Sequence, residues 1–179
     1  MEQNEYILNL IKDLITHQVK FIVCGGVAVI LQGVERFTMD LDLAVDMTHE
    51  NLHRFLEVIN KNGMSPRAPI PAESILDEDI IKAIVEQKHA SVFTFIDHAN
   101  PYRQIDVFIT EQHSYQSIIV DSENIVLDDA SFRIASVKKL IEMKKEIDPI
   151  RDKDRYDIKR LTEIEKETHG RQQKTKSDA

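Results

Sequence analysis

Residues 25–43, GGVAVILQGVERFTMDLDL, decide the expected fold of this chain. They follow an apolar, β-branched run at 19–24, VKFIVC, which predicts a buried strand ending at the two glycines. The next apolar stretch leads to Gly33, a plausible helix end. Residues 39–45 then alternate between acidic and apolar side chains, which is strand periodicity. The expected order is therefore strand, glycine turn, helix and strand.

The second of these strands carries a pair of acids. Asp40 and Asp42 are two positions apart, so their carboxylates project from the same face, while Leu41 and Leu43 project from the other. Adjacent carboxylates on a rigid strand repel each other, and a divalent cation is the usual compensation. Aspartate is also a poor strand former, so two in one short strand need a reason. The alternative explanation is a solvated strand face.

A third acid lies on a later strand. Asp106 is flanked by apolar residues in the segment 103–109, which we expect to form an antiparallel hairpin with residues 92–97. If this strand lies beside that of Asp40 and Asp42, all three carboxylates reach one patch. Such a platform binds two metal ions that align an attacking oxygen with a leaving pyrophosphate. The sequence thus predicts three catalytic carboxylates that are also ligands of Mg²⁺ or Mn²⁺.

Residues near the acidic pair are candidates for binding phosphate. Gly25 and Gly26 permit a tight turn and let backbone amides approach phosphate oxygens. Arg36 has the charge to contact phosphate, and Thr38 has a hydroxyl that either bonds phosphate or orients Asp40. The alternatives are a plain glycine turn and an arginine in solvent.

The remaining pattern predicts a mixed α+β (α/β-like) domain. Further helices are expected at residues 5–17, 48–62, 73–85, 136–147 and 151–167. Further strands are expected at residues 117–120, 124–127 and 132–135. The proline-rich segment 65–74 predicts a loop. We expect a single domain over residues 1–168, with a helical part at 136–168 and a disordered tail at 169–179.

Composition restricts the class of protein. Hydrophobic residues make up 42% of the 179 positions and charged residues 30%, as in ordinary globular proteins. The single cysteine, Cys24, excludes an internal disulfide and a cysteine-rich zinc site. No apolar run is long enough to span a bilayer and the N-terminus lacks a basic region, so we expect a cytoplasmic protein without a membrane partner. The net charge of −8 argues against broad coating of nucleic acid.

Together these motifs resemble the nucleotidyltransferase superfamily related to DNA polymerase beta. That superfamily combines an apolar strand, Gly-Gly or Gly-Ser, Asp-x-Asp and a third acid on a later strand. Residues 36–42, RFTMDLD, are more narrowly similar to a bacterial branch of minimal nucleotidyltransferases that includes abortive-infection toxins. The resemblance implies a mixed β-sheet nucleotidyltransferase fold flanked by helices.

The C-terminal segments carry the same resemblance. Residues 136–144 and 151–158 are similar to a helix ending in Leu-Ile-x-Met-Lys and to Arg-x-Lys-Asp-x-x-Asp-(Ile/Leu) in those relatives. By that similarity, Lys144 contacts the nucleotide phosphates, and Arg151 and Asp154 lie at the rim of the site. The alternative for these charges is the solvated face of amphipathic helices.

The implied activity is transfer of a nucleoside monophosphate from an NTP to an RNA, protein or small-molecule acceptor. A toxin with an antitoxin partner is one setting that the resemblance suggests. A nucleotide sensor or antitoxin-like interaction module with the same fold and little turnover is the alternative from another class. A metal-dependent phosphodiesterase or nuclease is a third.

Overall fold

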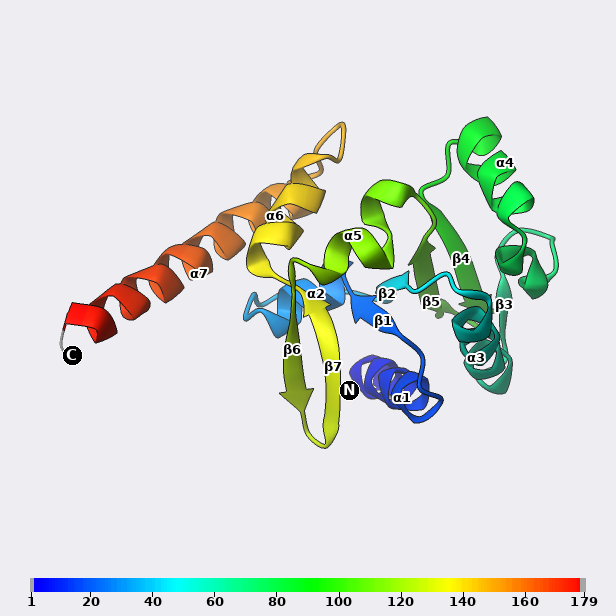
Figure 1. Ribbon diagram of the computed structural model, residues 1–179, viewed down its shortest axis with the longest axis horizontal. Coiled ribbons are helices and arrows are strands. Elements are labelled where there is room, and N and C mark those ends of the chain that lie inside the picture. Colours follow the sequence, from blue (N-terminus) through cyan, green and yellow to red (C-terminus); the bar gives the residue numbers. More distant parts are fainter. Residues whose placement is uncertain (1, 178–179) are drawn as a thin grey trace.

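The computed structural model describes residues 2–177, and the side chains of residues 5–168. Helices and strands alternate in a mixed α+β arrangement (Figure 1). The strands are β1 (Phe21–Val23), β2 (Asp40–Val45), β3 (Met64–Pro66), β4 (Val92–Asp97), β5 (Asn100–Phe108), β6 (Ser122–Leu127) and β7 (Ala130–Ala135). The α-helices are α1 (Glu2–Thr16), α2 (Gly25–Leu31), α3 (His49–Lys61), α4 (Glu78–Lys88), α5 (Tyr115–Ile119), α6 (Val137–Lys145) and α7 (Asp152–Ser177). Two short 3₁₀ helices are η1 (Ala72–Leu76) and η2 (Glu111–His113).

The strands form one seven-stranded mixed sheet in the order β3-β4-β5-β2-β1-β7-β6. At its centre, β2 pairs antiparallel with β1 and parallel with β5. Leu41 and Leu43 are buried on one face of β2, as their alternation with the acids predicts. The predicted hairpin is formed by β4 and β5, which pair antiparallel. The expected proximity of the two acidic strands is therefore confirmed.

The hydrophobic core is built from the central strands and the helices packed on them. Leu10 and Leu14 of α1 are buried, and α1 packs against α3. Phe55 of α3 meets Phe95 of β4 edge to face, with ring centroids 5.6 Å apart. Burying each such apolar side chain contributes about 1.5–3 kcal/mol, so these contacts hold the strands that carry the acids in fixed positions.

The C-terminal helices lie beside each other at one end of the sheet (Figure 1). Ser136, at the start of the helix expected at 136–147, caps α6, because its hydroxyl oxygen accepts a hydrogen bond from the amide of Lys139. Asp148-Pro149 separates α6 from α7, in the gap between the helices expected at 136–147 and 151–167. The backbone of α7 then continues to Ser177, whereas the sequence predicts a helix end near residue 167 and a disordered tail.

Two local predictions are wrong, and a third holds with a break. Residues 117–120, expected as a strand, lie largely in α5, where the Ser114 side chain accepts from the Ser117 amide and nucleates a helical turn. The expected loop at 65–74 contains part of β3 and of η1, because Pro66 ends an edge strand, where a missing N–H is tolerated. The helical structure expected at 73–85 is present, but Asp77 divides it into η1 and α4. Within residues 2–177, no helix has both the length and the apolar character to cross a membrane.

Candidate active site

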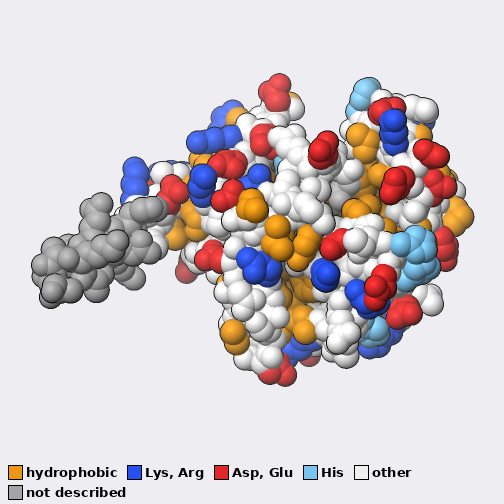
Figure 2. All heavy atoms as spheres, in the orientation of Figure 1, with side chains coloured by type: hydrophobic (Ala, Val, Ile, Leu, Met, Phe, Trp, Pro, Cys, Tyr) orange, Lys and Arg blue, Asp and Glu red, His pale blue; other side chains and the backbone are white. Residues whose placement is uncertain are grey.

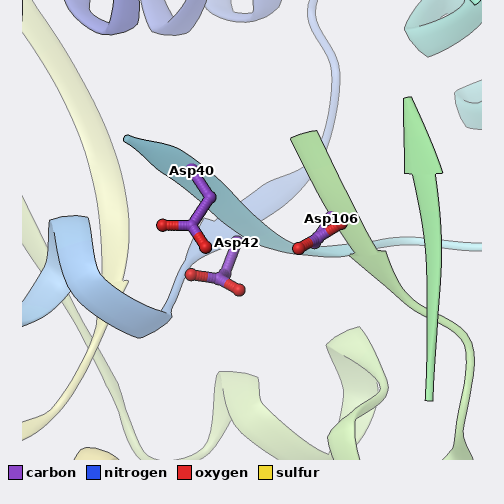
Figure 3. Close-up of side chains that lie close together, drawn as sticks. All are labelled: Asp40, Asp42 and Asp106. Carbon is purple, nitrogen blue, oxygen red and sulfur yellow. The ribbon is translucent and has the colours of Figure 1, made fainter. Parts of the chain in front are cut away.

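Three carboxylates meet on adjacent strands at the centre of the sheet. Asp40 and Asp42 project from β2 and Asp106 from β5, and the parallel register sets Asp42 opposite Asp106. One carboxylate oxygen from each residue lies within 4.8 Å of those of the other two. Figure 3 shows the Asp106 carboxylate turned toward the pair on β2. Among the described residues, no other cluster of three His, Cys, Asp or Glu side chains has this arrangement.

Hydrogen bonds orient two of the three carboxylates. Thr38 Oγ1 donates to Asp40 Oδ1 at 2.8 Å, which is the orienting role considered for Thr38 from the sequence. Thr94 Oγ1 donates to Asp106 Oδ1 at 2.6 Å, and Gln104 Nε2 donates to Asp106 Oδ2 at 2.7 Å. Such outer contacts fix the direction of carboxylates that would bind a metal.

The third carboxylate, Asp42, is buried beside the negative charges of the other two. Burial, as the largest cause, and the charges of Asp40 and Asp106 together raise the pKa of Asp42 to about 7. The amide of Gly26, which donates to Asp42 Oδ2 at 3.4 Å, and the charge of Lys144 oppose this rise. The site therefore has more negative charge than the protein alone neutralises.

The two glycines are required by the acids themselves. The backbone of Gly25 has a φ of +54°, and a Cβ added there would lie 1.8 Å from Asp42 Oδ2. A Cβ at Gly26 would lie 2.3 Å from Thr38 Oγ1. Helix α2 begins at Gly25, so the glycine pair belongs to the helix rather than to a turn before it. The glycine pair thus allows the first turn of α2 to lie in close contact with the strand that carries the acids. Binding of phosphate by the amides of Gly25 and Gly26 stays a prediction.

A cleft of about 610 Å³ opens over the acids. Every candidate site residue contributes to its lining: Gly25, Gly26, Arg36, Thr38, Asp40, Asp42, Asp106, Lys144, Arg151 and Asp154. The sequence had placed these residues in separate motifs, and the fold brings them to one cavity. The cleft has the size of a typical ligand pocket.

Several cations and acids of the cleft wall pair with each other. Lys144 is buried and lies 3.2 Å from Asp154 Oδ1 and 2.7 Å from Asp157 Oδ2. Arg36 pairs with the same oxygen of Asp157, and Arg151 Nε donates to Asp154 Oδ2 at 2.5 Å. Burial alone would raise the pKa of Asp154, but Arg151 and Lys144 hold it below its usual value. Lys144, Asp154 and Asp157 therefore do not lie on a solvated helix face.

Sequence motifs revealed only part of the other half of the cleft: Leu140 and Met143 lie in the Leu-Ile-x-Met-Lys motif, and the rest of this wall lies in no motif. Its apolar wall consists of Val92, Phe108, Leu140, Met143, Ile147 and Pro149. His113 joins this wall, and its Nε2 lies 2.8 Å from Glu146 Oε2. These residues come from β4, β5, η2, α6 and the segment between α6 and α7, so no single local spacing pattern connects them.

Comparisons with known proteins identify the fold. The chain matches no family model and no curated protein sequence. Among solved structures, it resembles the lincosamide antibiotic adenylyltransferase LnuA, crystallised with lincomycin bound. The TM-score is 0.56, and the match covers 92% of this chain and 97% of the other at 15% sequence identity. The fold is that of a nucleotidyltransferase.

This nucleotidyltransferase fold agrees with the mixed sheet and flanking helices that the sequence predicts. At 15% identity the likeness establishes the fold, not the reaction or the substrates. The narrower similarity of residues 36–42 to the toxin-containing branch stays a prediction, because the neighbour is an antibiotic-modifying enzyme.

Proposed function

We propose that the protein is a metal-dependent nucleotidyltransferase, which transfers a nucleoside monophosphate from an NTP to an acceptor and releases pyrophosphate. One observation carries this proposal. Carboxylate oxygens of Asp40, Asp42 and Asp106 lie within 4.8 Å of one another, and all three residues line a cleft of about 610 Å³. The nucleotidyltransferase fold supports it independently.

The acids fit a divalent cation by their chemistry. Asp40, Asp42 and Asp106 present only oxygen ligands, which Mg²⁺ and Mn²⁺ prefer. The raised pKa of Asp42 reflects a crowding of negative charge that a bound cation would relieve. Divalent ions held there would polarise the phosphates and neutralise charge on the leaving group.

The cleft wall offers complementary surfaces for the parts of a nucleotide. Arg36, Lys144 and Arg151 supply positive charge for a triphosphate. Asp154 holds Lys144 and Arg151 in place rather than facing phosphate directly. The apolar wall around Phe108 suits a nucleobase, because stacking and dispersion are tolerant of base identity.

The transfer itself follows from this arrangement. The acceptor hydroxyl oxygen attacks the α-phosphorus, and a new P–O bond forms as the bond to the bridging oxygen of the β-phosphate breaks. Pyrophosphate leaves with the electron pair. Asp106 takes the hydroxyl proton as general base, with Thr94 and Gln104 keeping its carboxylate in position.

An RNA, a protein and a small molecule are all chemically able to supply the attacking hydroxyl. The neighbour LnuA is named for a small-molecule antibiotic acceptor, which supports that choice here. A role as the toxin of a toxin–antitoxin pair, with an antitoxin partner, rests on the motif similarity at residues 36–42.

A second candidate is a nucleotide-binding sensor or antitoxin-like interaction module with little turnover. One observation favours it: Lys144 and Arg36, which would meet phosphate, both already pair with Asp157. Clustering of three acids argues against it, because a protein without metal chemistry gains nothing from their mutual repulsion.

The test is label transfer. Purified protein is incubated with each α-labelled NTP, Mg²⁺ and an extract containing small molecules, RNA and proteins, beside the Asp40→Ala/Asp42→Ala variant. Asp129→Ala, in an exposed pair with Lys12, is the matched control. We expect transfer by the wild type and the control only. NTP binding without transfer would favour the sensor, and absence of binding would refute the assignment.

A further inference from the structure

A second, smaller cavity adjoins the main cleft. This side cavity has a volume of about 270 Å³ and lies between the segment that leads into β2 and the start of β5. It shares four residues with the cleft: Arg36, Thr38, Asp40 and Lys153. Asp40 thus borders both cavities. Two molecules bound one in each would meet beside the acids.

The side cavity also reaches the third acid. Gln104 lines it and donates from Nε2 to Asp106 Oδ2 at 2.7 Å. The Oε1 atom of the same amide accepts a hydrogen bond from Arg67. Gln104 is held at both ends, so a molecule in the side cavity would lie against a fixed wall that adjoins Asp106.

The mouth of the side cavity exposes two aromatic side chains among charged and polar ones. Phe37 is 69% exposed and Tyr102 is 64% exposed. Met39 and Pro101 add apolar surface to a lining that also contains Arg36, Thr38, Asp40, Gln104 and Lys153. Phe37 and Tyr102 come from segments far apart in sequence, yet both border one cavity. Exposed aromatic side chains gathered at a cavity beside charged groups mark a binding site rather than incidental exposure.

Size and charge indicate the kind of molecule that fits. A volume of about 270 Å³ is at the small end for ligand pockets, so it holds a group of about one or two rings. Binding along an RNA strand would need a continuous basic surface. The chain has a net charge of −8, and Figure 2 shows acidic and basic side chains intermixed on the face it presents. These properties favour a small molecule.

We propose that the side cavity is the acceptor subsite, and that the acceptor is a small molecule carrying a hydroxyl group next to an apolar or aromatic ring. This inference rests on the proposed function and names its second substrate class. The ring lies against Phe37 and Tyr102, and the hydroxyl points past Asp40 into the main cleft. Its oxygen bonds to the α-phosphorus, pyrophosphate leaves, and the proton passes to Asp106.

The experiment compares Phe37→Ser and Tyr102→Ser with Val126→Ser, an equally exposed apolar side chain on β6. Each protein receives α-labelled NTP, Mg²⁺ and a cell extract, which is then separated into small-molecule, RNA and protein fractions. We expect label in the small-molecule fraction, reduced about tenfold by each aromatic substitution, while Val126→Ser matches the wild type. Calorimetry should give the same NTP affinity for all four proteins.

The other outcomes each overturn the inference in a distinguishable way. Unreduced transfer by both aromatic variants would put the acceptor elsewhere while leaving the proposed function intact. A matching loss of NTP affinity would make the side cavity part of the nucleotide site. Label in RNA or protein would refute the small-molecule class. No transfer by the wild type would refute the proposed function, and the acceptor subsite with it.

Discussion

Lys144 on α6 and Asp157 on α7 form a buried ion pair, with 2.7 Å between Nζ and Oδ2. Asp157 also pairs with Arg36, from the segment that leads into β2. One buried carboxylate therefore ties both C-terminal helices to the strand that carries Asp40 and Asp42. The pair holds the wall of the cleft in place as well as supplying its charge.

Removing the cation from this pair should destabilise the protein. Lys144→Met leaves Asp154 and Asp157 buried with fewer partners, so we expect the free energy of unfolding to fall by about 3 kcal/mol. Lys138→Met, whose exposed ammonium lies 3.8 Å from Glu142, should change it by less than about 1 kcal/mol. Urea unfolding followed by circular dichroism measures both. Equal effects would mean that the buried pair contributes no more than a surface pair.

Divalent metal should stabilise the folded protein through the three acids. At a concentration about 100 times the dissociation constant, Mg²⁺ or Mn²⁺ should raise the free energy of unfolding by about 2.7 kcal/mol. Asp106→Asn should abolish the rise, because it removes one oxygen ligand from the cluster, whereas Asp129→Asn should retain it. Thermal unfolding with and without metal tests this, and a rise that persists in Asp106→Asn would place the metal elsewhere.

Without metal, Asp42 should make stability depend on pH. Its folded-state pKa of about 7 lies above the ordinary value of 3.8, so the folded state binds the proton more tightly than the unfolded state. The resulting stabilisation is complete below about pH 4 and is lost as the pH rises to about 7 and beyond. Asp42→Asn cannot titrate, so it should lack this loss. Unfolding free energies of both proteins in chelator from pH 4 to pH 8 give the comparison; parallel curves would contradict it.

Gly25 and Gly63, which both have a positive φ, allow a matched comparison. Gly63, with a φ of +66°, has no atom within 4 Å of an added Cβ, so Gly63→Ala should cost only the backbone strain of about 1–2 kcal/mol. Gly25→Ala adds a collision with the Asp42 carboxylate, worth about 1–3 kcal/mol more. It should also abolish metal stabilisation, while Gly63→Ala keeps it. Chemical unfolding and metal titration of the two variants check both points.

The sequence by itself determined the local parts of the site. Alternation of acids with Leu41 and Leu43 requires a strand that is buried on one face, because side chains in a strand point to opposite faces in turn. Asp106 within an apolar strand, and Ser136 as a helix cap, follow from equally local rules. These patterns also led, through resemblance, to the nucleotidyltransferase fold that the structural comparison supports.

Only the tertiary structure decided which segments bring these site residues into contact. The parallel pairing of β2 with β5 places Asp42 opposite Asp106, and no spacing in the chain specifies which strands pair. The burial of Lys144 depends on how α6 and α7 pack, whereas helical spacing alone also allows a solvated face. The side cavity brings together Phe37, which precedes β2, and Tyr102, near the start of the neighbouring strand β5. Local propensity acts over a few residues, and contacts between distant segments depend on the packing of the whole chain.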